Sequence, residues 1–441
     1  MKNDAGEKLY QLTLHYRQAT DFYAQKRYRQ AIASADAVLR HLPDFIEALH
    51  VKGSALHGLG KYTQALQCFD KAISLRSDYA VAYIGKGYTL SELRAYEQAL
   101  QAFDAGLAIN PRIPSAHFNR GIVLAELGRY QEAVAAYDEA RRLGLDPSMT
   151  EAYYVKKGKA LGSAGDVIEA LKVVVEGMRR FPRNYDLFML KGILLDNLGQ
   201  MQLALEALDQ AIQLNHRAAE GSYIKGEILR KSGQLEPALA AFEQALKRQP
   251  NYPNALIGKG IALGMSGRHK EAVRAFTKAQ RLDPKNVDAY DNLSNALMLL
   301  GQPLKALGVA EDGIRLSPHN AELYRKKGLA LEHLQRYSEA LTAYDRALFY
   351  DPGEANAYHD KGVLLDKMGK PEEALDALNK ALSLNPQAAT SYHSKAIVLH
   401  KLRRYQEAIE ACDAALKINP QFLPARVKKE RIMNDMASRT I

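Results

Sequence analysis

One alanine returns at a fixed interval along almost the whole chain of 441 residues. Every step is 34 residues except one of 37, and the alanines are Ala31, Ala65, Ala99, Ala133, Ala170, Ala204, Ala238, Ala272, Ala306, Ala340, Ala374 and Ala408. A leucine column and a glycine column keep the same phase, and a proline closes most units. A period of 34 residues with helical spacing inside it predicts a helix–turn–helix solenoid, in which stacked pairs share a continuous core.

A single unit shows why each repeat should form two helices. In residues 46–79, Leu49, Gly53 and Leu56 are spaced three to four apart, which places them on one face of a first helix. Gly60 then ends that helix and opens a turn. A second helix follows, whose apolar stripe is Tyr62, Ala65, Leu66, Phe69, Ala72 and Ile73.

The columns of these units resemble those of the tetratricopeptide repeat (TPR) family. The match is plainest in residues 321–354, whose signature positions hold Tyr324, Gly328, Leu331, Tyr337, Ala340, Tyr344, Ala347 and Pro352. One departure is systematic, because the position before the glycine is basic in this chain and usually leucine in the family. The resemblance implies an all-α solenoid, a right-handed superhelix of twelve helix pairs with a C-terminal capping helix, and it leaves the function open.

The phase divides the chain into twelve repeats with two flanking segments. The expected divisions are a lead-in at 1–11, repeats one to four at 12–150, repeats five to twelve at 151–422, and a capping helix at 423–441. Three extra residues between Ala140 and Glu151 predict a longer, less constrained connection between repeats four and five. It is either a tolerated irregularity or a joint that bends when a partner binds.

Composition and motifs narrow the class of function. The N-terminal residues lack the apolar core of a signal peptide, no stretch is long and apolar enough to cross a membrane, and two cysteines predict no disulfide framework. We therefore expect a cytoplasmic protein without membrane insertion. No nucleotide-binding loop, catalytic serine motif or zinc signature is present, so we expect a non-enzyme with no cofactor and no metal.

Basic residues form a column of their own, just before the glycine position. It contains Lys52, Lys86, Arg120, Lys157, Lys191, Lys225, Lys259, Lys327, Lys361 and Lys395. Acidic residues recur on the second helices, so we expect structural lysines with nearby carboxylates. The alternative is a ladder that follows a polyanion. The net charge is +10, and residues 391–441 hold ten Lys and Arg against five Asp and Glu. Nucleic acid at this basic end therefore stays an alternative that we do not favour.

Residues at the fifth, ninth and twelfth positions of each repeat face the concave groove in this family. Read in that way, an apolar strip in the middle of the chain is predicted to bind a partner, and it comprises Phe118, Ile122, Val155, Met189, Ile193, Ile257, Ile261 and Met298. A polar groove end holds His359, Asp366, His393 and His400, which are expected to make ordinary polar contacts rather than a metal or pH-sensing cluster.

These observations favour a non-enzymatic scaffold or adaptor that holds a peptide or amphipathic helix of a partner protein in the groove. One alternative is a regulatory or nucleic-acid-associated protein that uses its basic C-terminal end. Another is a structural subunit of a larger assembly, including one built by self-association.

Overall fold

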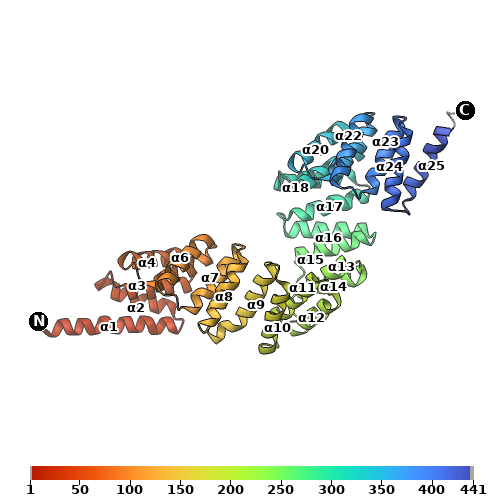
Figure 1. The fold of residues 1–441 in the computed structure, drawn as a ribbon. Coiled ribbons are helices and arrows are strands. Elements are labelled where there is room, and N and C mark those ends of the chain that lie inside the picture. The colour runs from red at the N-terminus through yellow and green to blue at the C-terminus, as the bar shows by residue number, and fades with distance from the viewer. Residues whose placement is uncertain (1, 438–441) are drawn as a thin grey trace. The chain divides into compact units, whose positions relative to one another are not determined.

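The computed structural model describes residues 2–437, and every regular element in that range is an α-helix (Figure 1). The chain divides into two compact units, unit 1 (Met1–His216) and unit 2 (Arg217–Ile441). Unit 1 contains α1 (Lys2–Ala24), α2 (Tyr28–His41), α3 (Ile46–Gly58), α4 (Tyr62–Leu75), α5 (Ala80–Glu92), α6 (Tyr96–Ile109), α7 (Pro114–Glu126), α8 (Tyr130–Arg142), α9 (Pro147–Ser163), α10 (Val167–Arg180), α11 (Tyr185–Asn197) and α12 (Met201–Leu214).

Unit 2 has the same alternation of helices. It contains α13 (Glu220–Lys231), α14 (Leu235–Arg248), α15 (Pro253–Met265), α16 (His269–Leu282), α17 (Val287–Leu299), α18 (Pro303–Leu316), α19 (Ala321–His333), α20 (Tyr337–Tyr350), α21 (Ala355–Lys367), α22 (Pro371–Leu384), α23 (Ala389–Lys401), α24 (Tyr405–Ile418) and α25 (Leu423–Ala437). Odd-numbered helices are the first helices of the repeats, and even-numbered helices are the second. Within the described residues, the predicted solenoid of twelve helix pairs with one final helix is confirmed.

The turn between the two helices of a repeat uses a left-handed backbone in all twelve repeats. Eight repeats place glycine there, with φ between +66° and +90°, as at Gly60 and Gly128. The other four repeats force a larger residue into the same conformation at Lys26, Arg94, Gln335 and Arg403. Glycine is the residue that adopts this region without steric cost, so the turn explains the recurrence of glycine after the first helix.

The alanine column lies in the core of every repeat. All twelve of its members are fully buried, from Ala31 to Ala408. The glycine column packs against a large side chain of the second helix: a Cβ added to Gly53 would lie 2.9 Å from the Phe69 ring, and one added to Gly226 would lie 2.7 Å from Phe242. Small residues therefore let the two helices approach each other closely.

The insertion between repeats four and five is absorbed by a helix. Helix α9 begins at Pro147, and the Asp146 carboxylate accepts a hydrogen bond of 2.8 Å from the Ser148 N–H. Capping by Asp146 and proline at the first turn both favour a helix start. The connection 143–146 is no longer than the connection 110–113 one repeat earlier, so the predicted longer loop is wrong.

The basic column is confirmed as structural in most repeats. Each paired side chain reaches back to an acidic residue on the second helix of the preceding repeat, with N···O distances from 2.5 to 2.9 Å, in the pairs Lys52–Asp36, Lys86–Asp70, Arg120–Asp104, Lys157–Asp138, Lys259–Glu243, Lys327–Glu311, Lys361–Asp345 and Lys429–Asp413. The cations of these pairs are thus engaged within the fold and are not a bare ladder for a polyanion.

Helix α25 closes the stack in the register of one more first helix. Lys429 continues the basic column, and Ala425 and Ile432 are fully buried. The apolar spacing of α25 also predicts Val427 and Met436 on the side that faces repeat twelve, but they are 54% and 45% exposed because they lie away from the packed side of the helix. Within residues 2–437, no helix combines the length and apolarity that crossing a membrane requires.

Candidate functional site

The first helices of each unit line one face, which we call the first-helix face. Within each unit, every first helix contacts the first helix of the next repeat, as α7 does with α9 and α21 with α23. Within either unit, neighbouring second helices of the described residues make no such contact. Closer approach on one side means that each unit curves with its first helices on the inside.

In unit 1, repeats four to six present apolar side chains on this face. Ile122 of α7 and Val155 of α9 are half-buried, and Ile193 of α11 is 36% exposed. Phe118 and Met189 were predicted to join them as surface anchors, but they are only 4% and 5% exposed. The Phe118 ring packs at 5.5 Å from the Tyr137 ring, so a large side chain at the fifth position reaches the core.

A pocket of about 270 Å³ opens between repeats four and five. Its lining combines apolar and charged side chains, namely Ile122, Ala125, Glu126, Tyr130, Tyr137, Lys156, Lys159, Ala160 and Ser163. The Tyr137 side chain is fully buried, and its hydroxyl has no hydrogen-bond partner among the described residues. Burial raises the pKa of Tyr137 far above its usual value, and the charge of Glu126 raises it further, so the hydroxyl stays protonated and is a donor.

A second pocket, of about 460 Å³, lies between repeats five and six. Val155 and Lys156 line it together with Glu151, Asn184 and Asp186. Lys156 therefore borders two successive pockets on the same face of unit 1.

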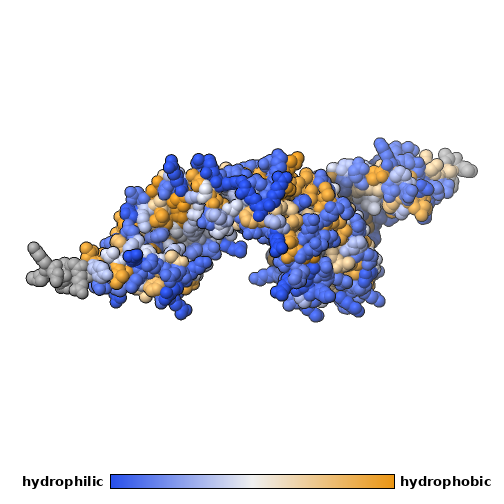
Figure 2. Space-filling view, turned by 90° about the horizontal axis from the view of Figure 1, so that it is seen from below, coloured by the Kyte–Doolittle hydropathy of each residue, from blue (hydrophilic) through white to orange (hydrophobic). Residues whose placement is uncertain are grey.

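In unit 2, the predicted apolar residues are fewer and more separated. Ile257 and Ile261 of α15 and Met298 of α17 are half-buried. Repeat seven, which precedes them, has an ion pair on this face instead, in which Arg230 contacts Glu227 at 2.7 Å. On the side of the molecule in Figure 2, hydrophobic residues form separate patches within a mainly hydrophilic surface.

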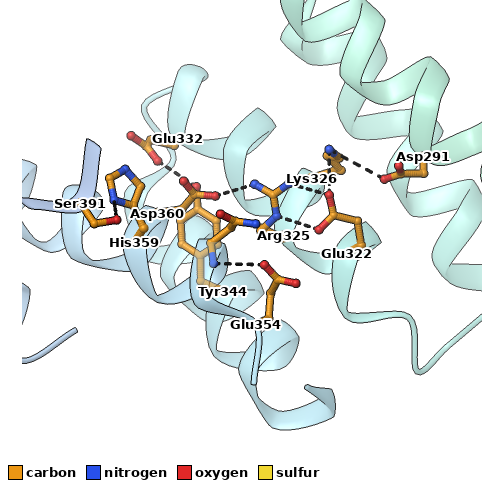
Figure 3. Close-up of polar contacts among 11 residues, drawn as sticks. Asp291, Glu322, Arg325, Lys326, Glu332, Tyr344, Glu354, His359, Asp360 and Ser391 are labelled. Carbon is orange, nitrogen blue, oxygen red and sulfur yellow. Dashed lines mark hydrogen bonds and ion pairs between the residues drawn. The ribbon is translucent and has the colours of Figure 1, made fainter. Parts of the chain in front are cut away.

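Repeats nine to twelve instead carry a network of charged side chains on this face (Figure 3). Arg325 of α19 lies between Glu322 of the same helix and Asp360 of α21, with an N···O distance to Asp360 of 2.8 Å. Lys326 contacts Glu322 at 2.8 Å and Asp291 of α17 at 4.0 Å. These contacts link three successive first helices.

A second set of contacts in the same repeats runs through Glu332. Glu332 is only 8% exposed. Its carboxylate accepts a hydrogen bond of 2.9 Å from the Tyr344 hydroxyl and pairs with Lys367 of the next repeat at 2.6 Å. One repeat further, Lys401 pairs with Asp366 at 2.7 Å.

The pKa directions show which of these carboxylates is held charged. Burial raises the pKa of Glu322, but Arg325 and Lys326 outweigh burial and bring it to about 2. At Asp360, burial raises the pKa and Arg325 opposes that rise without cancelling it. The stability of Asp360 as an anion therefore depends on Arg325.

The four residues of the predicted polar groove end make separate contacts. His359 lies 3.0 Å from the Ser391 hydroxyl (Figure 3), Asp366 pairs with Lys401, and the His393 ring packs against Phe422. His400 contacts Lys428 at 2.9 Å and Asp435 at 3.0 Å, both on α25. Burial lowers the pKa of all three histidines. Over residues 2–437, no cluster of three or more His, Cys, Asp or Glu is placed to hold a metal ion.

Reading the sequence by columns within one repeat missed the charged network. Its pairs Asp291–Lys326, Arg325–Asp360, Glu332–Lys367 and Asp366–Lys401 all join residues 35 apart. A search for opposite charges one repeat plus one residue apart would have found these pairs, because that offset joins adjacent first helices.

Comparisons with known proteins agree with the repeat structure. A family model described as "Tetratricopeptide repeat" matches residues 16–80, 84–149, 155–223, 223–287 and 359–421, and a second model with that description matches 318–387. The comparison with curated proteins gave no match.

Three solved structures illustrate the similarity. A chain of the APC/C hetero-tetramer Cut9-Hcn1 is 17% identical over 94% of this chain and 95% of its own, with a TM-score of 0.48. Yeast Tom70 is 17% identical over 98% of this chain and 97% of its own, with a TM-score of 0.47. YrrB, described as a TPR protein with an unusual peptide-binding site, is 29% identical over 43% of this chain and 98% of its own, with a TM-score of 0.36. The family models cover well over half of the sequence, and the chain belongs to the tetratricopeptide repeat family.

Proposed function

We propose that this protein is a non-enzymatic scaffold that binds a segment of a partner protein on the first-helix face, with repeats four to six of unit 1 as the main surface. Membership of the repeat family supports a role in protein interaction. The observation that carries the finer proposal is the exposure of Ile193, together with half-buried Ile122 and Val155, on three successive first helices.

Ile122 and Val155 pack partly against the core, but the repeat does not require an apolar side chain at every inner position. The ninth position holds half-buried Ile122 in repeat four and exposed Ile193 in repeat six, but charged Lys159 in repeat five. A partner segment with apolar side chains at helical or extended spacing would cover the isoleucines and leave the lysine at the edge of the interface. Ile261 of repeat eight is a smaller candidate surface of the same kind in unit 2.

The basic C-terminal end is less suited to bind nucleic acid than its composition indicates. Lys429 pairs with Asp413 at 2.5 Å, Lys428 lies 2.9 Å from His400, and Arg426 donates to the Pro420 carbonyl at 2.8 Å. Burial and the charge of Arg431 lower the pKa of Lys428. Three of the basic side chains on α25 therefore serve the contact between this helix and repeat twelve.

The test uses random twelve-residue peptides displayed on phage and selected against the full chain. Peptides that are retained would be synthesised and their affinity measured for the wild type, Ile193→Asp, Ile261→Asp and the double variant. We expect Ile193→Asp to weaken binding by about tenfold, since a charge would replace an apolar side chain that the partner covers in the complex. We expect Ile261→Asp to have a smaller effect. Unchanged affinity in all three variants, with unchanged thermal unfolding, would place binding elsewhere.

A further inference from the structure

Two repeats carry a tyrosine at one position of the second helix where no hydroxyl is needed for packing. Tyr137 of repeat four and Tyr344 of repeat ten are both fully buried against the glycine column. Most other repeats fill this position with an apolar side chain, namely Phe69, Phe103, Val174, Leu208, Phe242, Phe276, Ala310 and Leu378. The two hydroxyl groups therefore need their own explanation.

Repeat ten shows how such a hydroxyl is satisfied. Tyr344 donates to one oxygen of Glu332, and the other oxygen of Glu332 accepts from Lys367 of the following repeat (Figure 3 shows Tyr344 and Glu332). One carboxylate thus takes a hydrogen bond from a buried tyrosine and an ion pair from a lysine. All three groups belong to the chain itself.

Repeat four has the same tyrosine without the carboxylate. Ala125 stands at the position of Glu332, and Ser163 of repeat five stands at the position of Lys367. The Tyr137 hydroxyl consequently lacks an acceptor among the described residues, and Tyr137, Ala125 and Ser163 all line the pocket of about 270 Å³. A buried donor without an acceptor is unfavourable, whereas a group that enters the pocket can satisfy it.

The charges around this pocket favour an anion. Lys156 and Lys159 of α9 line it, both are exposed, and no ion pair engages either of them within the described part of the chain. Glu126 is the one acidic residue of the lining, so the two lysines outnumber it. A carboxylate would accept from Tyr137 on one side and pair with a lysine on the other, as Glu332 does in repeat ten.

We propose that the pocket between repeats four and five is a subsite for an aspartate or glutamate side chain of the bound protein segment. The proposal rests on the function proposed above and makes it more specific: the partner segment combines apolar residues with one acidic residue. Tyr137 supplies the buried donor, and Lys159 or Lys156 supplies the positive charge. Ala125 leaves the space that the carboxylate occupies.

The experiment uses the peptides selected on phage and a double-mutant cycle. Each acidic residue of a selected peptide is changed to its amide, and affinity is measured by fluorescence anisotropy on the full chain and its variants. Tyr137→Phe removes only the donor, and Ala125→Glu supplies a carboxylate from the chain itself. Ser91→Glu is the matched control, since it places the same carboxylate at the same position of repeat three, beside Phe103.

We expect selected peptides to share an acidic residue whose change to the amide weakens binding to the wild type by about tenfold. The same peptide change should have little effect on Tyr137→Phe and Ala125→Glu, and its full effect on Ser91→Glu. Each variant is first checked by thermal unfolding, and Tyr137→Phe is nearly isosteric.

Two other outcomes separate the subsite from the proposed function. Peptides that bind through the groove, lose affinity with Ile193→Asp and ignore Tyr137→Phe would overturn the subsite and leave the function standing. If the wild type retains no peptide at all, both the function and the subsite are overturned.

Discussion

The first-helix faces of repeats four to six and of repeats ten to twelve use the same sequence positions, but their side chains make different contacts. In repeats ten to twelve, Arg325, Glu332 and Asp366 find partners on the next repeat. In repeats four to six, Ile122 and Ile193 have no neighbour that covers them fully. The difference teaches that side chains on the first-helix face have two uses. They can form contacts that link neighbouring repeats, or they can remain accessible to a partner.

Tyr137 and Tyr344, at the same position of their repeats, show the same contrast. The hydroxyl of Tyr344 is satisfied by the chain, and that of Tyr137 is not. Since both rings are fully buried, the packing is alike and only the polar environment differs. We therefore call repeats ten to twelve the self-paired region, since its polar side chains pair within the chain. We interpret repeats four to six as the region that binds a partner.

The largest expected effect comes from breaking the charged network. Arg325→Met leaves Asp360, whose side chain is 15% exposed, without its ion-pair partner. We expect a loss of about 3–5 kcal/mol in the stability of repeats ten and eleven, measured by hydrogen exchange. The control is Lys361→Met, whose partner Asp345 is 52% exposed, with an expected loss below about 1 kcal/mol. Equal losses would show that the inner network is no stronger than the surface ladder.

The next effect compares the two tyrosines directly. Tyr344→Phe removes a donor to the buried carboxylate of Glu332, and we expect it to cost about 1–3 kcal/mol. Tyr137→Phe removes a hydroxyl without an acceptor, so its stability should stay within about 0.5 kcal/mol of the wild type or rise. Urea unfolding of both variants checks this. A similar cost at the two positions would mean that Tyr137 has a partner.

The stability of the self-paired region should depend on pH. Arg325 and Lys326 bring the pKa of Glu322 to about 2 despite burial, from an ordinary 4.5. A carboxyl group whose pKa is depressed in the folded state stabilises the fold above its unfolded pKa, and this stabilisation is lost as pH falls from about 4.5 towards 2. Hydrogen exchange of repeats nine to eleven at pH 5 and pH 3 should show a smaller pH effect in Glu322→Gln than in the wild type. An equal effect in both would rule out this carboxylate as its source.

The smallest expected effect concerns the turns between the two helices of a repeat. The turns of the two regions share a left-handed backbone but place different residues in it. Gln335 in repeat ten has φ of +60°, and Gly128 in repeat four has φ of +74°. Gln335→Gly should gain up to about 1 kcal/mol, and Gly128→Gln should lose about 1 kcal/mol, because only glycine adopts this region freely. Thermal unfolding of both variants measures the change. A loss on introducing glycine at 335 would contradict the steric account.

The sequence was sufficient to predict the repeats because their columns are set by local packing. The alanine column, the turn glycines and the basic column lie within one repeat or between adjacent repeats in a fixed register. The surface was harder to predict. Phe118 and Ile122 both occupy inner-face positions, yet only the structure shows that the Phe118 ring turns into the core against Tyr137.

The missing acceptor of Tyr137 could not be predicted from its own repeat. Its recognition required the comparison with Glu332, twelve residues before the equivalent Tyr344, and the finding that Ala125 takes that place in repeat four. The hinge expected at 141–151 remains a prediction, although the start of α9 at Pro147 leaves less irregular chain there than the insertion implied.

The central claim is that repeats four to six, rather than repeats ten to twelve, bind the partner segment. It is tested by two matched double variants at the ninth position, Ile122→Asp with Ile193→Asp, and Leu329→Asp with Val363→Asp. Ile122, Leu329 and Val363 are half-buried, and Ile193 is at the margin of exposure. Affinity for one selected peptide is measured by fluorescence anisotropy, with thermal unfolding alongside. We predict at least about a tenfold loss for the first variant and little change for the second, without unfolding of either. The opposite ranking, in folded proteins, would contradict the account.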